Sequence, residues 1–392
     1  MNALTKEMGK WLITSVALAG LTACGGDSDS SLEDVTDVVD TGTTDTTDQV
    51  VDSQGVTSLK VNAASYTDWV FVSLTEGKVL ELTAEEAETS TDWQLALRRT
   101  AIKVNGGDSG SGNVSVALAD AQDDFYNGDG SANPSVFMNA DADIEEAALL
   151  VAYDTSTLSY VQDSNEPALT DWYVYDFMTH QISADTSVGY LIRHADGATY
   201  SKLFIDAASY TGMTVRYETQ AAGTSQFAGD EETFSVEFGE DETLVCLDFD
   251  TVQSMDCAAD GWELQYEVDL SARAINLWTN GGVFGTGNGA VFGAIDAEAL
   301  AGYTSATVIN TANIASHYSQ DSSTGLFAEQ SWYAYNLGGN HKLWPNFRTY
   351  VVNTDSSTEG STQFALQISN YYSLEDSGSP ELRFIELATD GE

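Results

Sequence analysis

Apolar and polar residues alternate with a period of two along much of the chain, which is typical of β-strands with one buried face. The alternation is clear in residues 93–104 and in residues 233–238. Residues 70–82 contain two apolar runs around a glycine-containing turn, as a β-hairpin would. Only residues 83–89 and 144–151 have a helical pattern, and both segments are short. The pattern therefore predicts an all-β, antiparallel fold with two short helices.

The same residue pattern occurs twice, with an offset of about 160 to 175 residues, which is much longer than a solenoid repeat. Residues 93–107 and residues 262–282 each begin with Trp and end in Asn-Gly-Gly, and further glycines follow both. Residues 172–175 and 332–335 both read Trp-Tyr-x-Tyr. These paired segments predict a tandem duplication of one β-rich unit.

We expect the two units to be sequential domains at residues 57–218 and 232–392, each large enough to bury its own core. The segment Thr219–Glu232 is rich in small and acidic residues, as loops and linkers are, and we place the domain boundary there.

The N-terminus has the features of an export signal. A positively charged start precedes the apolar residues 11–21, which are too few to span a bilayer, and Leu-Thr-Ala then leads to Cys24. This pattern predicts a lipoprotein signal peptide at residues 1–23 and lipidation of Cys24, the alternative being an ordinary secretory signal with an incidental cysteine. Residues 24–56 are acidic and lack apolar periodicity, so we expect a disordered tether. Gly25 after the cysteine favours sorting to the outer membrane.

The chain is strongly acidic, with 61 Asp and Glu against 14 Lys and Arg and a formal net charge of −47. Nucleic-acid binding depends on basic surfaces, so this charge argues against a nucleic-acid partner. The charge is otherwise a matter of solubility and association rather than of fold.

The two remaining cysteines, Cys246 and Cys257, both lie in the second copy. A disulfide between them is expected for an exported chain. A metal site is the weaker alternative, because no histidine or third cysteine is near them in the sequence.

Five segments together resemble the HmuY family. They are the Trp-x-Leu-x-x-x-Arg pattern of residues 93–99, Asn-Gly-Gly at 105–107, Trp-Tyr-x-Tyr at 172–175, the strand and Asp-Gly turn at 190–197, and Lys-Leu at 202–203. The resemblance covers almost all of the first copy. It is partial in the second, where residues 355–360 replace the Asp-Gly turn.

The resemblance implies the function as well as the fold. Members of the HmuY family are all-β, haem-binding lipoproteins of the bacterial outer membrane, which capture haem and pass it to a TonB-dependent receptor. We therefore expect a binding protein and not an enzyme, with haem as its cargo. Its partners would be outer-membrane lipid through Cys24, a TonB-dependent haem receptor and host or environmental haemoproteins, and its location would be the cell surface.

Histidine is the commonest axial ligand of haem iron, and the chain has four histidines, two in each copy. His180 and His341 follow the Trp-Tyr-x-Tyr segments at nearly the same distance, so both are predicted to bind iron. His194 is a further candidate, although its counterpart in the second copy is Thr354, which favours a structural role.

The family uses His or Met pairs, so the resemblance implies one pair in each copy. The predicted pairs are Met138 with His180, and His317 with His341. A Met is otherwise more often a packing residue than a ligand.

Other functions lack a motif. No Gly-x-Ser-x-Gly, His-Glu-x-x-His or P-loop pattern is present, so a hydrolase ranks last. Calcium binding by residues 123–129 is a weak alternative, because their spacing is not that of an EF-hand. A surface binding or adhesion module without haem is the main alternative. It is favoured by the scarcity of basic side chains that could pair with the haem propionates. The candidates are Arg98, Arg99, Lys103, Arg193, Lys202, Lys342 and Arg348.

The lipoprotein signal yields a first testable prediction. Replacing Cys24 by Ala removes the thiol that accepts the lipid, so the chain should no longer partition with membranes after cell fractionation. If the Cys24→Ala chain is recovered with the outer membrane as fully as the parent, the lipid anchor is refuted.

Overall fold

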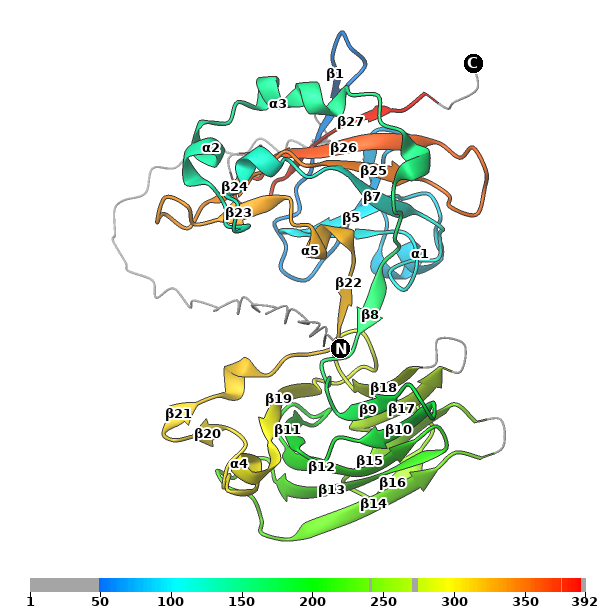
Figure 1. The fold of residues 1–392 in the computed structure, drawn as a ribbon, viewed down its shortest axis with the longest axis vertical. Coiled ribbons are helices and arrows are strands. Elements are labelled where there is room, and N and C mark those ends of the chain that lie inside the picture. Colours follow the sequence, from blue (N-terminus) through cyan, green and yellow to red (C-terminus); the bar gives the residue numbers. More distant parts are fainter. Residues whose placement is uncertain (1–48, 240–241, 270–273, 375, 389–392) are drawn as a thin grey trace, which may run out of the picture. The chain divides into compact units, whose positions relative to one another are not determined.

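The structure is a computed structural model, and it describes residues 49–239, 242–269, 274–374 and 376–388. The predicted signal peptide, Cys24 and most of the predicted tether lie outside these residues. The described chain consists mainly of antiparallel strands in two lobes, which confirms the all-β fold class (Figure 1). No helix in the described ranges has the length and apolar character needed to cross a membrane.

The first lobe, which we call the flanking lobe, combines residues 49–163 with residues 325–388. Its six-stranded sheet has the order β1(Gln49–Val51)-β2(Thr57–Lys60)-β27(Glu381–Glu386)-β26(Gln363–Asn370)-β25(Thr349–Asn353)-β7(Ser115–Asp120). Its four-stranded sheet has the order β4(Lys78–Leu80)-β3(Val70–Ser73)-β5(Leu95–Arg98)-β6(Ala101–Val104). The lobe also contains the hairpin β23(Tyr333–Tyr335)–β24(Leu343–Pro345) and the helices α1(Ala84–Thr89), η1(Asp123–Phe125), α2(Pro134–Asn139), α3(Ala142–Leu149), η2(Thr155–Thr157) and α5(Leu326–Glu329).

The second lobe, which we call the nested lobe, is formed by residues 168–321. Its five-stranded sheet has the order β14(Glu231–Glu237)-β13(Gly212–Gln220)-β12(Tyr200–Ser209)-β11(Val188–Arg193)-β19(Ala290–Asp296). Its four-stranded sheet has the order β16(Gln253–Met255)-β15(Leu244–Asp248)-β17(Leu264–Asp269)-β18(Ala274–Thr279). The remaining elements are the hairpins β9(Tyr173–Asp176)–β10(Gln181–Ala184) and β20(Val308–Ile309)–β21(Ala312–Asn313), and the helices α4(Ala297–Ala301) and η3(Ala315–His317).

Each lobe contains strands from both copies of the duplicated sequence. In the flanking lobe, β7 of the first copy pairs with β25 of the second. In the nested lobe, β11 of the first copy pairs with β19 of the second, and β13 pairs with β14. The chain passes between the lobes twice, as β8(Ser164–Glu166) and β22(Ser322–Thr324), and these two strands pair with each other. The two copies have therefore exchanged halves.

This topology corrects the predicted domain boundaries at 57–218 and 232–392. Residues 219–232 do not separate two domains, because Glu218 pairs with Glu231 and the residues between them close a hairpin. Small and acidic residues suit a hairpin loop and a linker equally well, so composition could not tell the two apart. The predicted tether also ends too late, since β1 begins at Gln49 and Val56 is only 1% exposed.

Several local predictions are confirmed. Residues 70–82 form the β3–β4 hairpin, and residues 93–104 form β5 and β6 around a turn. The two predicted helices correspond to α1 and α3, and α2, α4 and α5 are additional. Cys246 and Cys257 form the expected disulfide.

The duplication is visible in matching side-chain contacts. The indole N–H of Trp93 donates to the carbonyl of Ala87, and that of Trp262 donates to the carbonyl of Cys257. The same holds for two amide side chains, because Asn105 Oδ1 accepts from Gly112 N at 2.9 Å and Asn280 Oδ1 accepts from Gly287 N at 2.9 Å. Both Asn-Gly-Gly turns have a glycine at positive φ, 64° at Gly107 and 73° at Gly282, as a sharp turn between strands requires.

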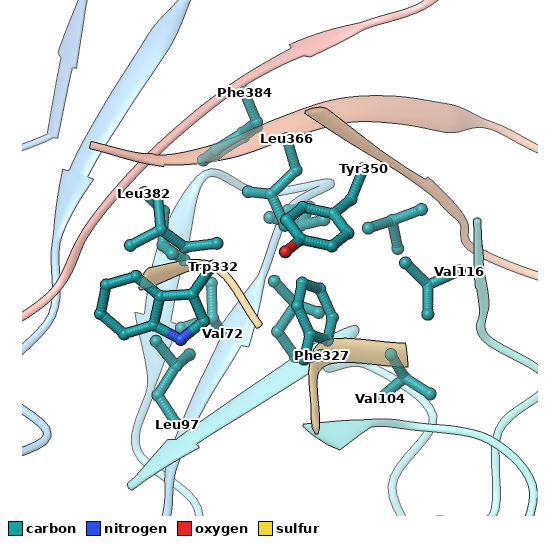
Figure 2. Packing of buried hydrophobic residues seen from close by; sticks show 14 of the residues in the cluster. Val72, Leu97, Val104, Val116, Phe327, Trp332, Tyr350, Leu366, Leu382 and Phe384 are labelled. Carbon is teal, nitrogen blue, oxygen red and sulfur yellow. The ribbon is translucent and has the colours of Figure 1, made fainter. Parts of the chain in front are cut away.

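The core of the flanking lobe is shared between the copies (Figure 2). Trp332 and Tyr350 of the second copy are 1% and 0% exposed, and they lie in one cluster with Val72, Leu97 and Val116 of the first. The Trp332 indole N–H also donates to the carbonyl of Thr100, which belongs to the first copy. Burying a side chain of this size stabilises the fold by about 3 kcal/mol or more. The association of the two copies is therefore part of the folded core.

A buried aspartate lies at the end of each lobe where the chain leaves it. Asp163 is 5% exposed and its Oδ2 accepts from Val104 N at 2.9 Å. Asp321 is 2% exposed and accepts from Thr279 N at 2.6 Å and from Ala168 N at 2.7 Å. Burial raises the pKa of both carboxyls to about 6.

The exchange of halves can be tested by cutting the chain once. A protease site placed between Gly223 and Thr224, in the exposed part of the β13–β14 loop, would divide the chain into its two copies. Since each copy supplies strands to both lobes, the cut fragments should stay together in size-exclusion chromatography and separate only in denaturant.

The parent chain with the same protease added is the control for cleavage elsewhere. Two sequential domains would instead fall apart after the cut and elute at half the mass. That result under native conditions would overturn the exchanged topology.

The two buried aspartates predict a pH dependence of stability. Between pH values of about 4 and 6 the folded chain binds more protons at Asp163 and Asp321 than the unfolded chain does, so their contribution lowers the free energy of unfolding as pH rises through this range. In a chain carrying Asp163→Asn and Asp321→Asn this contribution is absent. Urea unfolding at several pH values should then give a flatter profile than the parent, and an unchanged slope would contradict the assignment.

Candidate functional site

His180 occupies the tip of the β9–β10 hairpin. The turn is held by Asp176, whose carbonyl accepts from His180 N at 2.8 Å and whose Oδ1 accepts from Met178 N at 2.7 Å. His180 has a φ of 56°, in the left-handed region that His enters more readily than most residues. Its Nδ1 lies 2.7 Å from the hydroxyl of Tyr175 on β9.

His341 occupies the tip of the β23–β24 hairpin in the same way. Its φ is 57°, its backbone N–H donates to Asn336 Oδ1 at 2.8 Å, and its Nδ1 lies 2.7 Å from the hydroxyl of Tyr335. The two predicted histidines therefore share conformation and partner, although they lie in different lobes. We call each arrangement a Tyr–His turn.

The Tyr–His turn leaves one ring nitrogen of each histidine free. Among the described residues, Nε2 of His180 and Nε2 of His341 make no hydrogen bond, and both side chains are exposed. A tyrosine hydroxyl can accept as well as donate, so it can hold the tautomer that carries its proton on Nδ1. That tautomer presents the Nε2 lone pair to a metal, and a hydrogen bond at the other nitrogen is what orients most metal-binding histidines.

Met138 belongs to the flanking lobe. It is 46% exposed on α2, a helix that contacts β24 (Figure 1). Its methyl group lies 3.6 Å from the position that a Cβ on Gly338 would take. Gly338 is in the Tyr–His turn of His341. The structure thus brings Met138 beside the turn of His341, whereas His180 is in the nested lobe.

Neither of the predicted pairs lies within one lobe. His317 ends η3 in the nested lobe, the lobe that contains His180. Because the copies exchange halves, a first-half ligand of one copy shares a lobe with the second-half histidine of the other. The pairs that share a lobe are Met138 with His341 and His317 with His180.

Exposed apolar side chains surround the nested Tyr–His turn. Phe177 and Met178 are 81% and 90% exposed, and the Phe177 ring packs edge-on against Tyr175 with centroids 4.9 Å apart. Large apolar side chains gathered at one loop tip commonly mark a binding surface.

Basic groups are few near these turns, and most are engaged elsewhere. Arg98 and Arg99 stack over Trp69 and Tyr66, and Lys202 pairs with Glu218 at 2.6 Å. Arg348 donates to the carbonyls of Ala121 and Ser331. It also lines a cavity of about 480 Å³ together with five other residues of the flanking lobe, which are Asp123, Tyr126, Asn127, Gly128 and Gly130. Tyr126 packs on Phe137, the neighbour of Met138 on α2, with ring centroids 5.7 Å apart.

His194 is not part of either Tyr–His turn. It is 1% exposed, with Nε2 at 2.7 Å from Ser201 Oγ and Nδ1 at 3.5 Å from Glu263 Oε1 and 3.7 Å from Asp250 Oδ1. Burial lowers the pKa of His194 to about 4 and raises that of Glu263 to about 8. Burial also leaves the imidazole no face for a porphyrin, which contradicts haem ligation by His194 and agrees with the structural role that Thr354 favours.

The sequence did not single out Glu263 or Asp250. They lie more than fifty residues from His194, and acidic residues are too frequent in this chain for any one to stand out. A signal was nevertheless present, because the residue after the repeated Trp is Gln94 in the first copy and Glu263 in the second.

Residues 65–220 match the model of the HmuY family, described as HmuY protein. This match confirms the resemblance noted in the sequence over these residues. The matched stretch is continuous in sequence but contributes strands to both lobes.

Two solved structures are similar to the chain at low identity. One is a "putative lipoprotein" from Bacteroides fragilis NCTC 9343, with 12% identity and a TM-score of 0.30, covering 88% of this chain and 96% of that chain. The other is a "putative HmuY-like heme binding protein" from Bacteroides vulgatus ATCC 8482, with 10% identity and a TM-score of 0.28, covering 86% of this chain and 93% of that chain. A search of curated proteins finds no match.

Proposed function

We propose that the chain is a lipid-anchored, haem-binding protein of the outer-membrane surface. The observation that carries this proposal is the Tyr–His turn, which occurs once in each lobe with the same geometry. The match of residues 65–220 to a family of haem-binding lipoproteins supports haem as the ligand.

In the flanking lobe, the haem would bind at the β23–β24 turn, beside α2. His341 would bind the iron through Nε2 while Nδ1 donates to the Tyr335 hydroxyl, and Met138 would supply the thioether on the other side. Both residues are exposed, so a planar ligand can reach them without unfolding the lobe. Arg348 lines the adjoining cavity, and a propionate would pair with it.

In the nested lobe, His180 would bind a second haem through Nε2, and His317 is the partner proposed from the same lobe. Phe177 and Met178 would cover the apolar edge of the porphyrin. This contact would remove from water two apolar side chains that are exposed in its absence.

The anchor and the partners follow from the same proposal. Cys24 would carry the lipid that holds the protein at the outer membrane, and the acidic segment after it would give the folded part reach. Haem taken from host or environmental haemoproteins would then pass to a TonB-dependent receptor. Exposed axial ligands suit such a transfer, since the receiving protein can approach the iron.

Absorption spectroscopy of the full chain with haemin tests the proposal. His or Met on both sides of the iron gives a six-coordinate, low-spin spectrum, so we expect a sharp, shifted Soret band. His341→Ala and Met138→Ala should each turn the flanking-lobe haem high-spin, and Tyr335→Phe should weaken binding about tenfold by removing the partner that orients His341.

Asn340→Ala, next to His341 on the same turn, is the matched control and should leave the spectrum unchanged. His180→Ala should affect only the second equivalent of haemin. A chain that shows no Soret change with haemin in either redox state does not bind haem, and the surface binding module without haem then becomes the better hypothesis.

A further inference from the structure

Three side chains of the nested lobe converge at a point remote in sequence from both Tyr–His turns. His194 follows the last residue of β11, Asp250 lies in the turn between β15 and β16, and Glu263 immediately precedes β17. Their nearest nitrogen and oxygen atoms all lie within 4.8 Å of one another. β11 belongs to the five-stranded sheet, whereas the other two elements belong to the four-stranded sheet.

The imidazole of His194 has a buried nitrogen without a partner. Its Nε2 is satisfied by Ser201 Oγ at 2.7 Å, but Nδ1 makes no hydrogen bond although the ring is 1% exposed. Leaving a buried polar atom unpaired costs about 1–3 kcal/mol, and such atoms are rare in folded proteins. This nitrogen points at two carboxylates that are too far away for a hydrogen bond.

The separations fit atoms that share a cation. Nδ1 lies 3.5 Å from Glu263 Oε1 and 3.7 Å from Asp250 Oδ1. Ligands bound at about 2.0–2.2 Å to one tetrahedral ion are separated from each other by roughly 3.4 Å. A single ion between the three side chains would therefore satisfy Nδ1 with little movement.

The fold needs only a neutral hydrogen-bond acceptor at the position of Glu263, not a carboxylate. Glu263 is 2% exposed and its Oε2 accepts from Phe249 N at 2.7 Å. The flanking lobe has the same bond, in which Gln94 Oε1 accepts from Leu74 N at 2.9 Å. A neutral amide thus serves the structural role, and the nested lobe has a buried acid in its place at an added desolvation cost.

At the other two positions as well, the nested lobe has a possible metal ligand and the flanking lobe has a threonine. Thr354 is the counterpart of His194, since each follows its strand directly and its N–H closes the next turn. Thr75 is the counterpart of Asp250. Val72 in β3 and Leu247 in β15 pair with equivalent residues of β5 and β17, and Thr75 and Asp250 each lie three residues further along the chain. All three candidate ligands are present in one lobe and all three are absent from the other.

We propose that His194, Glu263 and Asp250 form a binding site for one divalent transition-metal ion, with zinc as the representative ion. One imidazole and two carboxylates suit a borderline cation, whereas calcium takes oxygen ligands only. Asp250 is 68% exposed, so water completes the coordination from that side. The ion would join the two sheets of the nested lobe.

Zinc titration of the full chain in detergent tests the site. Calcium is present in large excess to occupy the many surface carboxylates, and we expect one zinc ion per chain with a higher melting temperature. The exposed His180 and His341 also offer imidazoles, so the titration is repeated on a chain with both replaced by Ala, which should still bind one ion.

Glu263→Gln is the decisive variant, because the amide retains the acceptor for Phe249 N as Gln94 does in the flanking lobe. It should weaken zinc binding at least about tenfold, because replacing even a residue that only hydrogen-bonds to a metal ligand lowers metal affinity by that factor. It should also abolish the rise in melting temperature. His194→Thr and Asp250→Thr copy the flanking-lobe residues and should do the same. Asp230→Asn, an exposed acid in the β13–β14 loop, should bind zinc like the parent.

Cobalt(II) gives an independent readout, since its visible absorption reports nitrogen coordination and should disappear in His194→Thr. If the parent binds no zinc stoichiometrically under excess calcium, or if Glu263→Gln folds and binds zinc as tightly as the parent, the proposed site is refuted. The haem titration does not depend on these residues, so either proposal can fail without the other.

Discussion

The structure depends on the burial of second-copy aromatic side chains among first-copy strands. Trp332 fills the flanking lobe between the two sheets, and its indole N–H is satisfied by a carbonyl of the first copy. The matching position in the nested lobe is Trp172, which packs 6.0 Å from the ring of Tyr266 in the other copy. Each Trp is therefore buried in a core that contains residues of both copies.

The exchange also determines which functional residues meet. The first half of each copy could pack against the second half of the same copy or against the second half of the other copy. In this structure it packs against the other copy. Met138 therefore reaches the turn of His341 instead of that of His180. The local chemistry survives this rearrangement, since the Tyr–His turn is made within a single hairpin. Short-range geometry and long-range pairing are thus set by different parts of the sequence.

This separation explains what the sequence could predict. The β3–β4 hairpin, α1 and the Cys246–Cys257 disulfide depend on residues close in the chain, and all three were predictable. The equivalence of His180 and His341 was predictable because each follows a repeated Trp-Tyr-x-Tyr segment. The choice of partner half was not, because two similar copies offer two nearly equal pairings and periodicity does not distinguish them. Residues 219–232 were mistaken for a boundary for a different reason, because small and acidic residues suit a hairpin loop and a linker equally well.

The differences between the lobes carry information that the similarities do not. Where the flanking lobe has Gln94, a neutral group that satisfies one backbone N–H, the nested lobe buries Glu263 beside the unpaired nitrogen of His194. Buried acids and orphaned imidazoles are each costly, and the cheaper solution is present in the same chain. A packing role therefore does not explain the more costly set, whereas a bound cation would satisfy both groups at once. The duplication thus serves as an internal reference, in which the departure from the shared scaffold singles out the residues of the proposed metal site.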